Sequence, residues 1–137
     1  MNKETAQTPE VSWARISVRV PTATFPLDHV ERVLGRQTHR YRKDGTPSPH
    51  WWIARFAPTG EEPLEDQLLA VKEFLAANLD ALRSLDGQGE INVFIGWTPR
   101  RGQDSVAFDP ELIALVAQVG GFILLDTHTD DCDHECD

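Results

Sequence analysis

The segment from Pro63 to Gly87 constrains the fold most, because it carries one apolar stripe with helical spacing. Apolar residues recur there at steps of three or four, the period that places side chains on one face of an α-helix. They are Leu64, Leu68, Val71, Leu75, Leu79 and Leu82. Burying these side chains contributes on the order of 10 kcal/mol before conformational entropy is subtracted. The pattern therefore predicts one long amphipathic helix packed against a second layer.

Four shorter segments are typical of β-strands. "ARISVRV" (14–20) and "INVFIGW" (91–97) alternate apolar with other residues, which predicts strands with two different faces. "HWWIARF" (50–56) is aromatic and β-prone. "FILLD" (122–126) is apolar on both faces, which predicts a strand in the middle of a sheet. A short strand across His39–Arg42 would be the fifth.

Two further helices are predicted from their end signals. In "LDHVERVLG" (27–35) we expect Asp28 to cap the helix together with Glu31, and Gly35 to end it. In "DPELIALVAQVGG" (109–121) we expect Asp109 to cap the helix and Pro110 to occupy its first position.

The order of these elements predicts an α+β fold in two layers. Strands and helices alternate along the chain, so the helices should collect on a face of the sheet. We expect a two-layer sandwich with a four- or five-stranded sheet, one long helix and two shorter helices. One domain should span residues 11–129, between a flexible leader (1–10) and an acidic Cys/His tail (130–137).

The net charge, the apolar runs and the cysteines of the sequence indicate which partners and which location to expect. The 137 residues have a formal net charge of −9, and the tail contributes five acids and no Lys or Arg. We therefore do not expect nucleic acid as a partner. Neither an apolar run of membrane-spanning length nor a secretory signal is present in the sequence, so no membrane association is expected. The only cysteines, Cys132 and Cys136, lie in the tail, which fits a cytoplasmic protein without a disulfide framework.

The order of several motifs resembles a bacterial family known as domain of unknown function 4279. The matching pieces run from about Ser12 to His128: "ARISVRV", "VERVLG", "KDG" before "HWWIARF", the Leu-rich helix, "INVFIGW" and "DPELIALVAQVGGFILLD". The family supplies neither an established activity nor catalytic residues. Small bacterial α+β proteins of this sort are sometimes immunity or accessory proteins of toxin systems, and the resemblance carries that expectation to this chain.

A basic segment and an adjacent pair of tryptophans are the candidate binding surface. Arg32 to Lys43 holds five of the 13 basic residues, and a turn-rich loop follows. Arginine forks pair with carboxylate or phosphate, and neighbouring aromatic rings add contact area. Since Trp51 and Trp52 are adjacent in a strand, their side chains face opposite ways, and one should fill the core. The candidate binding residues are Arg36, Arg40, Tyr41, Arg42, Lys43, Trp51 and Trp52.

The tail is a candidate metal site. His128, Cys132, His134 and Cys136 offer nitrogen and sulfur ligands of the kind that zinc takes. Their spacing differs from familiar zinc motifs, and the surrounding acids favour a solvated chain. We favour a solvated tail without a cofactor, and keep a weak zinc site and a redox pair as alternatives.

The sequence holds no familiar catalytic motif. G-x-S-x-G, H-E-x-x-H and the P-loop are all missing. We therefore expect a non-enzymatic protein-interaction module, of the immunity-type or accessory kind, with a protein as its partner. The alternatives are a small enzyme with a pocket of His and Asp residues, and a weak metal-binding protein that uses the tail. The sequence does not predict an oligomeric state.

Overall fold

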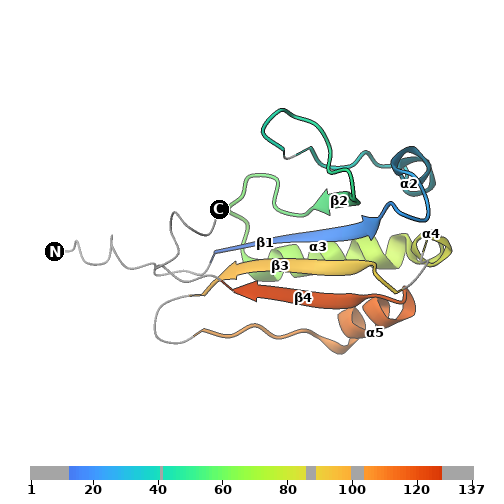
Figure 1. The fold of residues 1–137 in the computed structure, drawn as a ribbon. Coiled ribbons are helices and arrows are strands. Elements are labelled where there is room, and N and C mark those ends of the chain that lie inside the picture. The colour runs from blue at the N-terminus through green and yellow to red at the C-terminus, as the bar shows by residue number, and fades with distance from the viewer. Residues whose placement is uncertain (1–12, 41, 86–88, 100–103, 128–137) are drawn as a thin grey trace.

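The fold is α+β in two layers, as predicted. The computed structural model describes residues 13–40, 42–85, 89–99 and 104–127. In chain order these form β1 (Trp13–Pro21), α2 (Leu27–Leu34), β2 (Trp51–Arg55), α3 (Leu64–Ala77), α4 (Leu79–Ser84), β3 (Asn92–Thr98), α5 (Pro110–Gln118) and β4 (Phe122–Thr127). Figure 1 shows the strands as one layer with α3 behind it. The predicted leader (1–10) and acidic tail (130–137) lie outside the described residues.

The strands form one mixed sheet in the order β2-β1-β3-β4. β1 pairs antiparallel with both β2 and β3, whereas β4 runs parallel to β3. The prediction that "FILLD" is a central strand is therefore wrong, because β4 lies at an edge. An apolar run on both faces is typical of a central strand, but it also fits an edge strand whose side chains stay exposed. Phe122, Leu124 and Leu125 are 44%, 44% and 41% exposed.

Gly121 allows β4 to approach β3. A Cβ atom at this position would collide with the carbonyl oxygen of Ile91. The backbone of Phe122 donates a hydrogen bond to that same oxygen at 3.1 Å. A residue without a side chain is needed where two backbones come this close.

The two faces of the sheet differ. Alternate residues of β1 and β3 face the helices and meet across the sheet, for example Ile16 with Ile95 and Val18 with Val93. All four described helices contribute buried side chains to this core. The other side, here called the open face, has no described helix over it (Figure 1). By strand alternation its residues are Trp13, Arg15, Ser17, Arg19, Pro21, Trp51, Ile53, Arg55, Asn92, Phe94, Gly96, Thr98, Phe122, Leu124 and Asp126.

The predicted long helix is two helices. The chain breaks at Asn78, whose φ of −119° lies outside the helical range and whose side chain donates to the carbonyl oxygen of Phe74. The apolar stripe is confirmed across the break. Val71, Leu75 and Leu82 are completely buried, Leu64 is buried, and Leu68 and Leu79 are partly buried.

The end signals of the shorter helices are confirmed in part. Gly35 ends α2 with a φ of 64°, and the Asp109 carboxylate caps α5 by accepting from the backbone of Leu112 at 2.8 Å. The predicted cap at Asp28 is wrong, because Pro26 precedes the helix and no side chain caps it. Glu31 instead accepts from the backbone of Thr38 at 2.9 Å and so fixes the chain beyond the helix.

Gln67 on α3 joins the helix layer to the sheet. Its side chain is completely buried, in the same helix as the apolar stripe. The amide oxygen accepts from the backbone of Ile16 at 2.9 Å, and the amide nitrogen donates to the carbonyl oxygens of Ala14 at 2.8 Å and Glu62 at 2.9 Å. β2 pairs only with residues 17–21 of β1. Gln67 therefore takes the place of a neighbouring strand where β1 extends beyond β2.

We expect Gln67→Leu to lower the free energy of unfolding by about 2–4 kcal/mol. Leucine has a similar size, but it leaves the backbone groups of Ala14, Ile16 and Glu62 buried without these partners, and such groups each cost about 1–3 kcal/mol. Urea unfolding measures the change. The control is Glu73→Gln on the exposed face of α3, which should change stability by less than about 0.5 kcal/mol. Equal stability of both variants would contradict the role of the buried amide.

Candidate functional site

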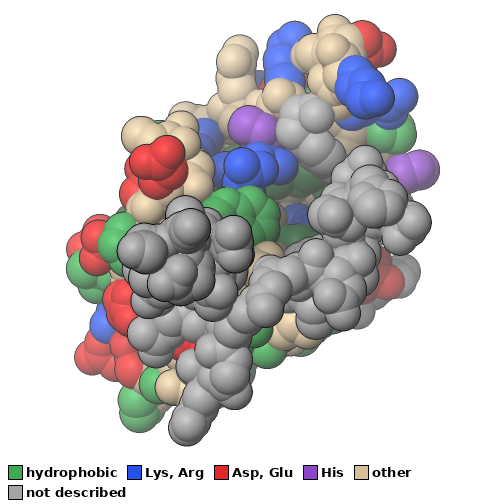
Figure 2. All heavy atoms as spheres, turned by 90° about the vertical axis from the view of Figure 1, so that its left-hand side faces the viewer, with side chains coloured by type: hydrophobic (Ala, Val, Ile, Leu, Met, Phe, Trp, Pro, Cys, Tyr) green, Lys and Arg blue, Asp and Glu red, His purple; other side chains and the backbone are tan. Residues whose placement is uncertain are grey.

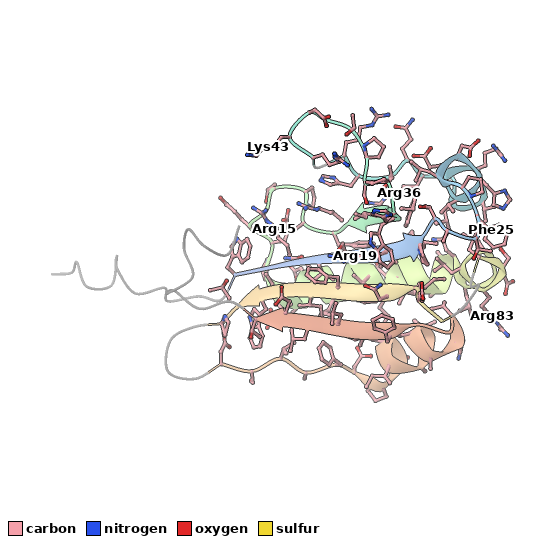
Figure 3. The ribbon with its side chains drawn as sticks, in the orientation of Figure 1. Arg15, Arg19, Phe25, Arg36, Lys43 and Arg83 are labelled. Carbon is pink, nitrogen blue, oxygen red and sulfur yellow. The ribbon has the colours of Figure 1, made fainter. Side chains whose placement is uncertain are left out.

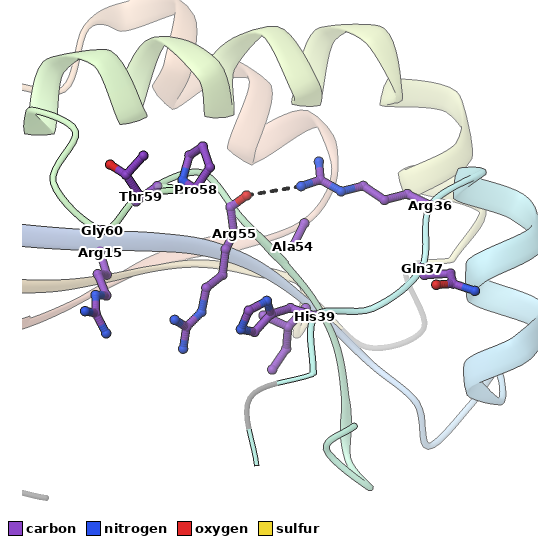
Figure 4. A pocket seen from close by; sticks show the side chains of 11 residues that line it. Arg15, Arg36, Gln37, His39, Ala54, Arg55, Pro58, Thr59 and Gly60 are labelled. Carbon is purple, nitrogen blue, oxygen red and sulfur yellow. Dashed lines mark hydrogen bonds between the residues drawn. The ribbon is translucent and has the colours of Figure 1, made fainter. Parts of the chain in front are cut away.

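A basic pocket lies at the outer edge of β2. It has a volume of about 380 Å³ and brings together residues from β1, β2, the segment after α2 and the loop after β2. Three of its lining residues are arginines and one is a histidine: Arg15, Arg36, Arg55 and His39. No acid is among the 11 lining residues. We call these four basic residues with their surrounding wall the arginine pocket (Figure 4).

Two of the arginines come from neighbouring strands. Arg15 on β1 and Arg55 on β2 both belong to the open face, and Figure 4 shows their side chains extending to the same side of the sheet. Gly60 forms part of the wall beside Arg15: a Cβ atom at Gly60 would lie 3.5 Å from Arg15 Nη2. Gly60 also has a φ of +83°, so the loop turns there in a conformation that suits glycine.

Arg36 enters the pocket from the other side of β2. Its Nη2 donates to the carbonyl oxygen of Arg55 at 3.1 Å, as the dashed line in Figure 4 marks. Its guanidinium carbon lies 5.3 Å from the ring centre of Phe56 and 5.8 Å from that of Phe74. Such cation–π contacts hold the group in place without cancelling its charge. Arg36 thus ties the segment after α2 to β2 and also contributes a positive charge to the pocket.

The segment before the loop covers the edge of β2 and positions His39. The backbone of Ile53 donates to Thr38 Oγ1 at 2.8 Å, and the backbone of His39 donates to the Ile53 carbonyl oxygen at 2.7 Å. Here residues 38–39 take the role of a strand partner, although the predicted strand across His39–Arg42 is not formed in the described residues of that range. The contact places the imidazole against Arg55. Burial, and secondly the charge of Arg55, lower the pKa of His39 below its ordinary value.

Aromatic rings accompany the arginines on the open face. The guanidinium of Arg15 lies 4.9 Å from the ring centre of Trp13. That of Arg19 lies 3.9 Å from Phe94 and 5.9 Å from Trp51. A hollow of about 180 Å³ between these groups adjoins the arginine pocket, since Arg15, Ile53 and Arg55 line both. Figure 3 shows Arg15 and Arg19 following one another along β1.

Acidic side chains gather in a neighbouring hollow that shares Gly60 with the arginine pocket. Figure 2 shows basic and histidine side chains in the upper part of one end of the molecule and most acids to the lower left. A hollow of about 620 Å³ at the start of α3 is lined by four acids: Glu61, Glu62, Glu65 and Asp104. Groups of opposite charge therefore occupy two adjoining hollows at this end of the sheet.

The structure does not bring the predicted binding residues together at one site. Arg36 lines the pocket, whereas Arg40, Arg42 and Lys43 are exposed in the following loop and do not line it. Trp51 is half-buried on the open face. The assignment of Trp52 to the binding surface is wrong, because this residue is completely buried and its Nε1 donates to the Arg36 carbonyl oxygen at 3.0 Å. Tyr41 lies outside the described residues.

Sequence reasoning missed the residues that complete the pocket, namely Arg15, Arg55 and His39. The two arginines occupy polar positions of alternating strands, and that pattern alone indicates solvent exposure. The sequence signal that could have identified them is strand alternation, which places both arginines on the same face of the sheet. Arg15 and Arg19 fall on one side of the first strand, and Arg55 falls on the same side once the two strands pair.

The proposed metal ligands cannot be placed. His128, Cys132, His134 and Cys136 all lie outside the described residues. Among residues 13–40, 42–85, 89–99 and 104–127, no three His, Cys, Asp or Glu side chains come together as a metal site would require. The weak zinc site and the redox pair in the tail stay predictions.

Comparisons with protein-family models, curated proteins and solved structures find no match for this chain. The resemblance to domain of unknown function 4279 stays a prediction. Within the described part of the chain, no helix combines the length and apolar character needed to cross a membrane.

We expect the His39 ring to titrate below about 6.5, the ordinary value for histidine. Its pKa should rise in Arg55→Gln, since a positive neighbour is removed, but stay below that value because burial is the larger cause. NMR titration of the imidazole in both proteins measures this. Because the folded pKa is depressed, the unfolded chain binds the proton more readily, so this group costs stability as the pH falls below about 6.5. A His39 pKa that falls or stays unchanged in Arg55→Gln would contradict the contact.

Proposed function

We propose that the protein is a non-enzymatic interaction module, of the immunity-type or accessory kind, that holds an acidic segment of a partner protein. The observation that carries this proposal is the arginine pocket: the described residues that line it include three arginines and a histidine and no acid. A guanidinium offers planar pairs of N–H donors that match a carboxylate. The natural occupant of such a pocket is the carboxylate of an Asp or Glu side chain.

The surroundings of the pocket favour a polypeptide over a small anion. The pocket continues into the open face, where Trp13 and Phe94 lie under the guanidinium groups of Arg15 and Arg19. Trp and Arg are enriched among the residues that contribute most to protein–protein binding. A partner can therefore place a carboxylate in the pocket and neighbouring apolar side chains on the rings beside it.

The basic residues of the exposed loop would speed the encounter with an acidic partner. Arg40, Arg42 and Lys43 are exposed and follow His39 directly in the chain. Charges at the rim of an interface mainly accelerate encounter with an oppositely charged partner. The formal net charge of −9 repels any acidic partner, but it repels a phosphate backbone, which carries a charge at every nucleotide, more than a short acidic segment that fits one pocket.

The alternatives have less support. An enzyme with a His and Asp pocket needs an acid beside the histidine, whereas the lining around His39 includes none within the part of the chain that the structure describes. A metal-binding function depends on tail residues that lie outside the described part of the chain. An interaction module needs neither feature.

We expect Arg15→Glu and Arg55→Glu each to weaken binding of an acidic peptide by about tenfold or more. A hydrogen bond to a charged group contributes about 1.5–3 kcal/mol, and 1.4 kcal/mol corresponds to tenfold in affinity. The probe is a fluorescein-labelled peptide rich in Glu and Leu, and fluorescence anisotropy gives its affinity. The same peptide with Gln in place of each Glu should bind much more weakly to the unaltered protein.

The matched control is Arg83→Glu, which changes the net charge equally. Arg83 is exposed on α4 and lies at the opposite end of the molecule from Arg15 (Figure 3). Charge reversal at Arg40 and Arg42 should mainly slow association. Equal losses in Arg83→Glu and Arg15→Glu would show attraction to overall charge only and would contradict a pocket. Tighter binding of a single-stranded oligonucleotide than of the acidic peptide would replace the protein partner with nucleic acid.

A further inference from the structure

The hollow beside the arginine pocket has a floor of small residues. Ser17 on β1 and Gly96 on β3 are diagonal neighbours on the open face, because Ser17 pairs with Phe94 and Gly96 pairs with Arg15. Both line the hollow, which has a volume of about 180 Å³. We call it the Gly96 hollow. Larger side chains stand around this floor: Trp13, Arg15, Arg19, Ile53, Arg55 and Phe94.

The fold itself does not require a glycine at position 96. A Cβ atom there would lie 3.6 Å from Phe94 Cε2 and 3.8 Å from the carbonyl oxygen of Arg15, which are ordinary contacts. Gly96 is also not among the glycines with a positive φ. At Gly121, by contrast, a Cβ atom would collide with the backbone. Glycine inside a strand weakens the strand, and it often marks the close approach of a ligand. Gly96 therefore keeps open a space that a bound group can use.

The walls of the Gly96 hollow suit an apolar group. The guanidinium of Arg15 lies 4.9 Å from the ring centre of Trp13, and that of Arg19 lies 3.9 Å from the ring centre of Phe94. These contacts hold the charged ends of the two arginines on aromatic rings. The parts of both side chains nearest the backbone are methylene groups, which form apolar surface. Rings, methylene groups and Ile53 thus make up most of the wall.

Charge around the hollow also favours an uncharged occupant. The three arginines of the lining repel a basic side chain. Asp126 lies on the open face directly opposite Gly96 on β4, and it weakens the attraction for a second carboxylate. An apolar side chain meets neither repulsion. The arginine pocket next to it, which Arg36 and His39 complete, attracts the carboxylate.

The two hollows are close enough for one segment to fill both. Arg15, Ile53 and Arg55 line both of them. The arginine pocket lies at the outer edge of β2, and the floor of the Gly96 hollow belongs to β1 and β3, so one or two strand spacings, about 5–10 Å, separate them. In an extended segment, residues i and i+2 project from the same side, about 7 Å apart.

We propose that the Gly96 hollow binds one apolar side chain of the partner, two residues away from the carboxylate in the arginine pocket. The inference rests on the proposed function and adds a sequence requirement to it. A cavity of about 150 Å³ is large enough to hold benzene, so the hollow has room for one side chain of the size of Leu or Phe. The partner segment is thus extended, and the order of its residues decides binding together with its charge.

Four fluorescein-labelled peptides with identical flanks test the requirement by fluorescence anisotropy. Their central residues are Glu-Ser-Leu, Glu-Ser-Ala, Glu-Leu-Ser and Glu-Ser-Glu. The Glu-Ser-Leu peptide should bind about tenfold more tightly than the Glu-Ser-Ala peptide, since the Leu side chain leaves water. It should also bind more tightly than Glu-Leu-Ser, in which Leu and Glu project from opposite sides, and more tightly than Glu-Ser-Glu.

The variant Gly96→Val fills the hollow and should remove the preference for Leu. The affinity for the Glu-Ser-Ala peptide should stay nearly unchanged, because the substitution leaves the arginine pocket intact. The matched control is Thr98→Val, which introduces the same side chain on the same face of β3 but lines neither hollow. This control should keep the preference for Leu. Circular dichroism checks that both variants are folded.

NMR supplies a test that needs no substitution. The Gly96 amide should shift on addition of the Glu-Ser-Leu peptide but not of the Glu-Ser-Ala peptide, whereas the His39 ring should shift with both. Equal affinity for these two peptides, tighter binding of Glu-Ser-Glu, or a Leu preference that persists in Gly96→Val would overturn the inference and leave the proposed function standing. Failure of all four peptides to bind would overturn both.

Discussion

The packing of α3 against the sheet depends on the buried side-chain amide of Gln67. β1 extends beyond the end of β2. The buried backbone N–H and C=O groups of that extension have no partner in β2, so they need other hydrogen-bond partners in the protein. Gln67 satisfies Ile16 and Ala14 as a strand would, and it also holds the carbonyl oxygen of Glu62. One side chain therefore fixes the position of α3 on the sheet and of the loop that leads into it. The same loop forms one wall of the arginine pocket through residues 57–60.

The arginine pocket forms where residues 36–39 cover the outer edge of β2. Beyond the end of β2, no strand in the described ranges continues on that side of β1, and the loop after β2 and basic side chains occupy the space. Thr38 and His39 satisfy the outer edge of the strand with their own polar groups, and Arg36 bonds to the Arg55 carbonyl oxygen. The contacts that cover the outer edge of β2 thus bring Arg36 and His39 next to Arg55. The same contacts that prevent strand pairing at this edge create the proposed recognition site for a carboxylate.

Much of the fold could be predicted from the sequence, because local periodicity reports which side of an element is buried. The alternation in the first strand and the stripe containing Val71 and Leu75 both gave the correct buried face. Strand order is not encoded locally, and so the apolar pattern of β4 did not distinguish a central strand from an exposed edge. Gln67 was missed for a related reason: a polar residue beside an apolar stripe looks solvated until the strand that it completes is known.

The site was harder to predict than the fold. Arg36 was identified because it belongs to a basic segment that is continuous in sequence. Arg15 and Arg55 are 40 positions apart (55 − 15), and only the pairing of β1 with β2 brings them to one face. Trp51 and Trp52 were correctly expected to face opposite ways, but their alternation does not say which of them is buried. Strand pairing and burial decide both questions, and neither is visible in a local pattern.

The central claim is that a carboxylate of the partner binds among Arg15, Arg55 and His39. The most direct measurement is an NMR titration that follows the arginine side-chain N–H signals and the His39 ring as unlabelled acidic peptide is added. The account predicts saturable shifts of Arg15 and Arg55 and a rise in the His39 pKa, because a nearby negative charge stabilises the protonated ring. The signal of Arg83, at the far end of the molecule, should not move. Shifts confined to Arg40 and Arg42, with Arg15 and Arg55 unchanged at saturation, would contradict the account.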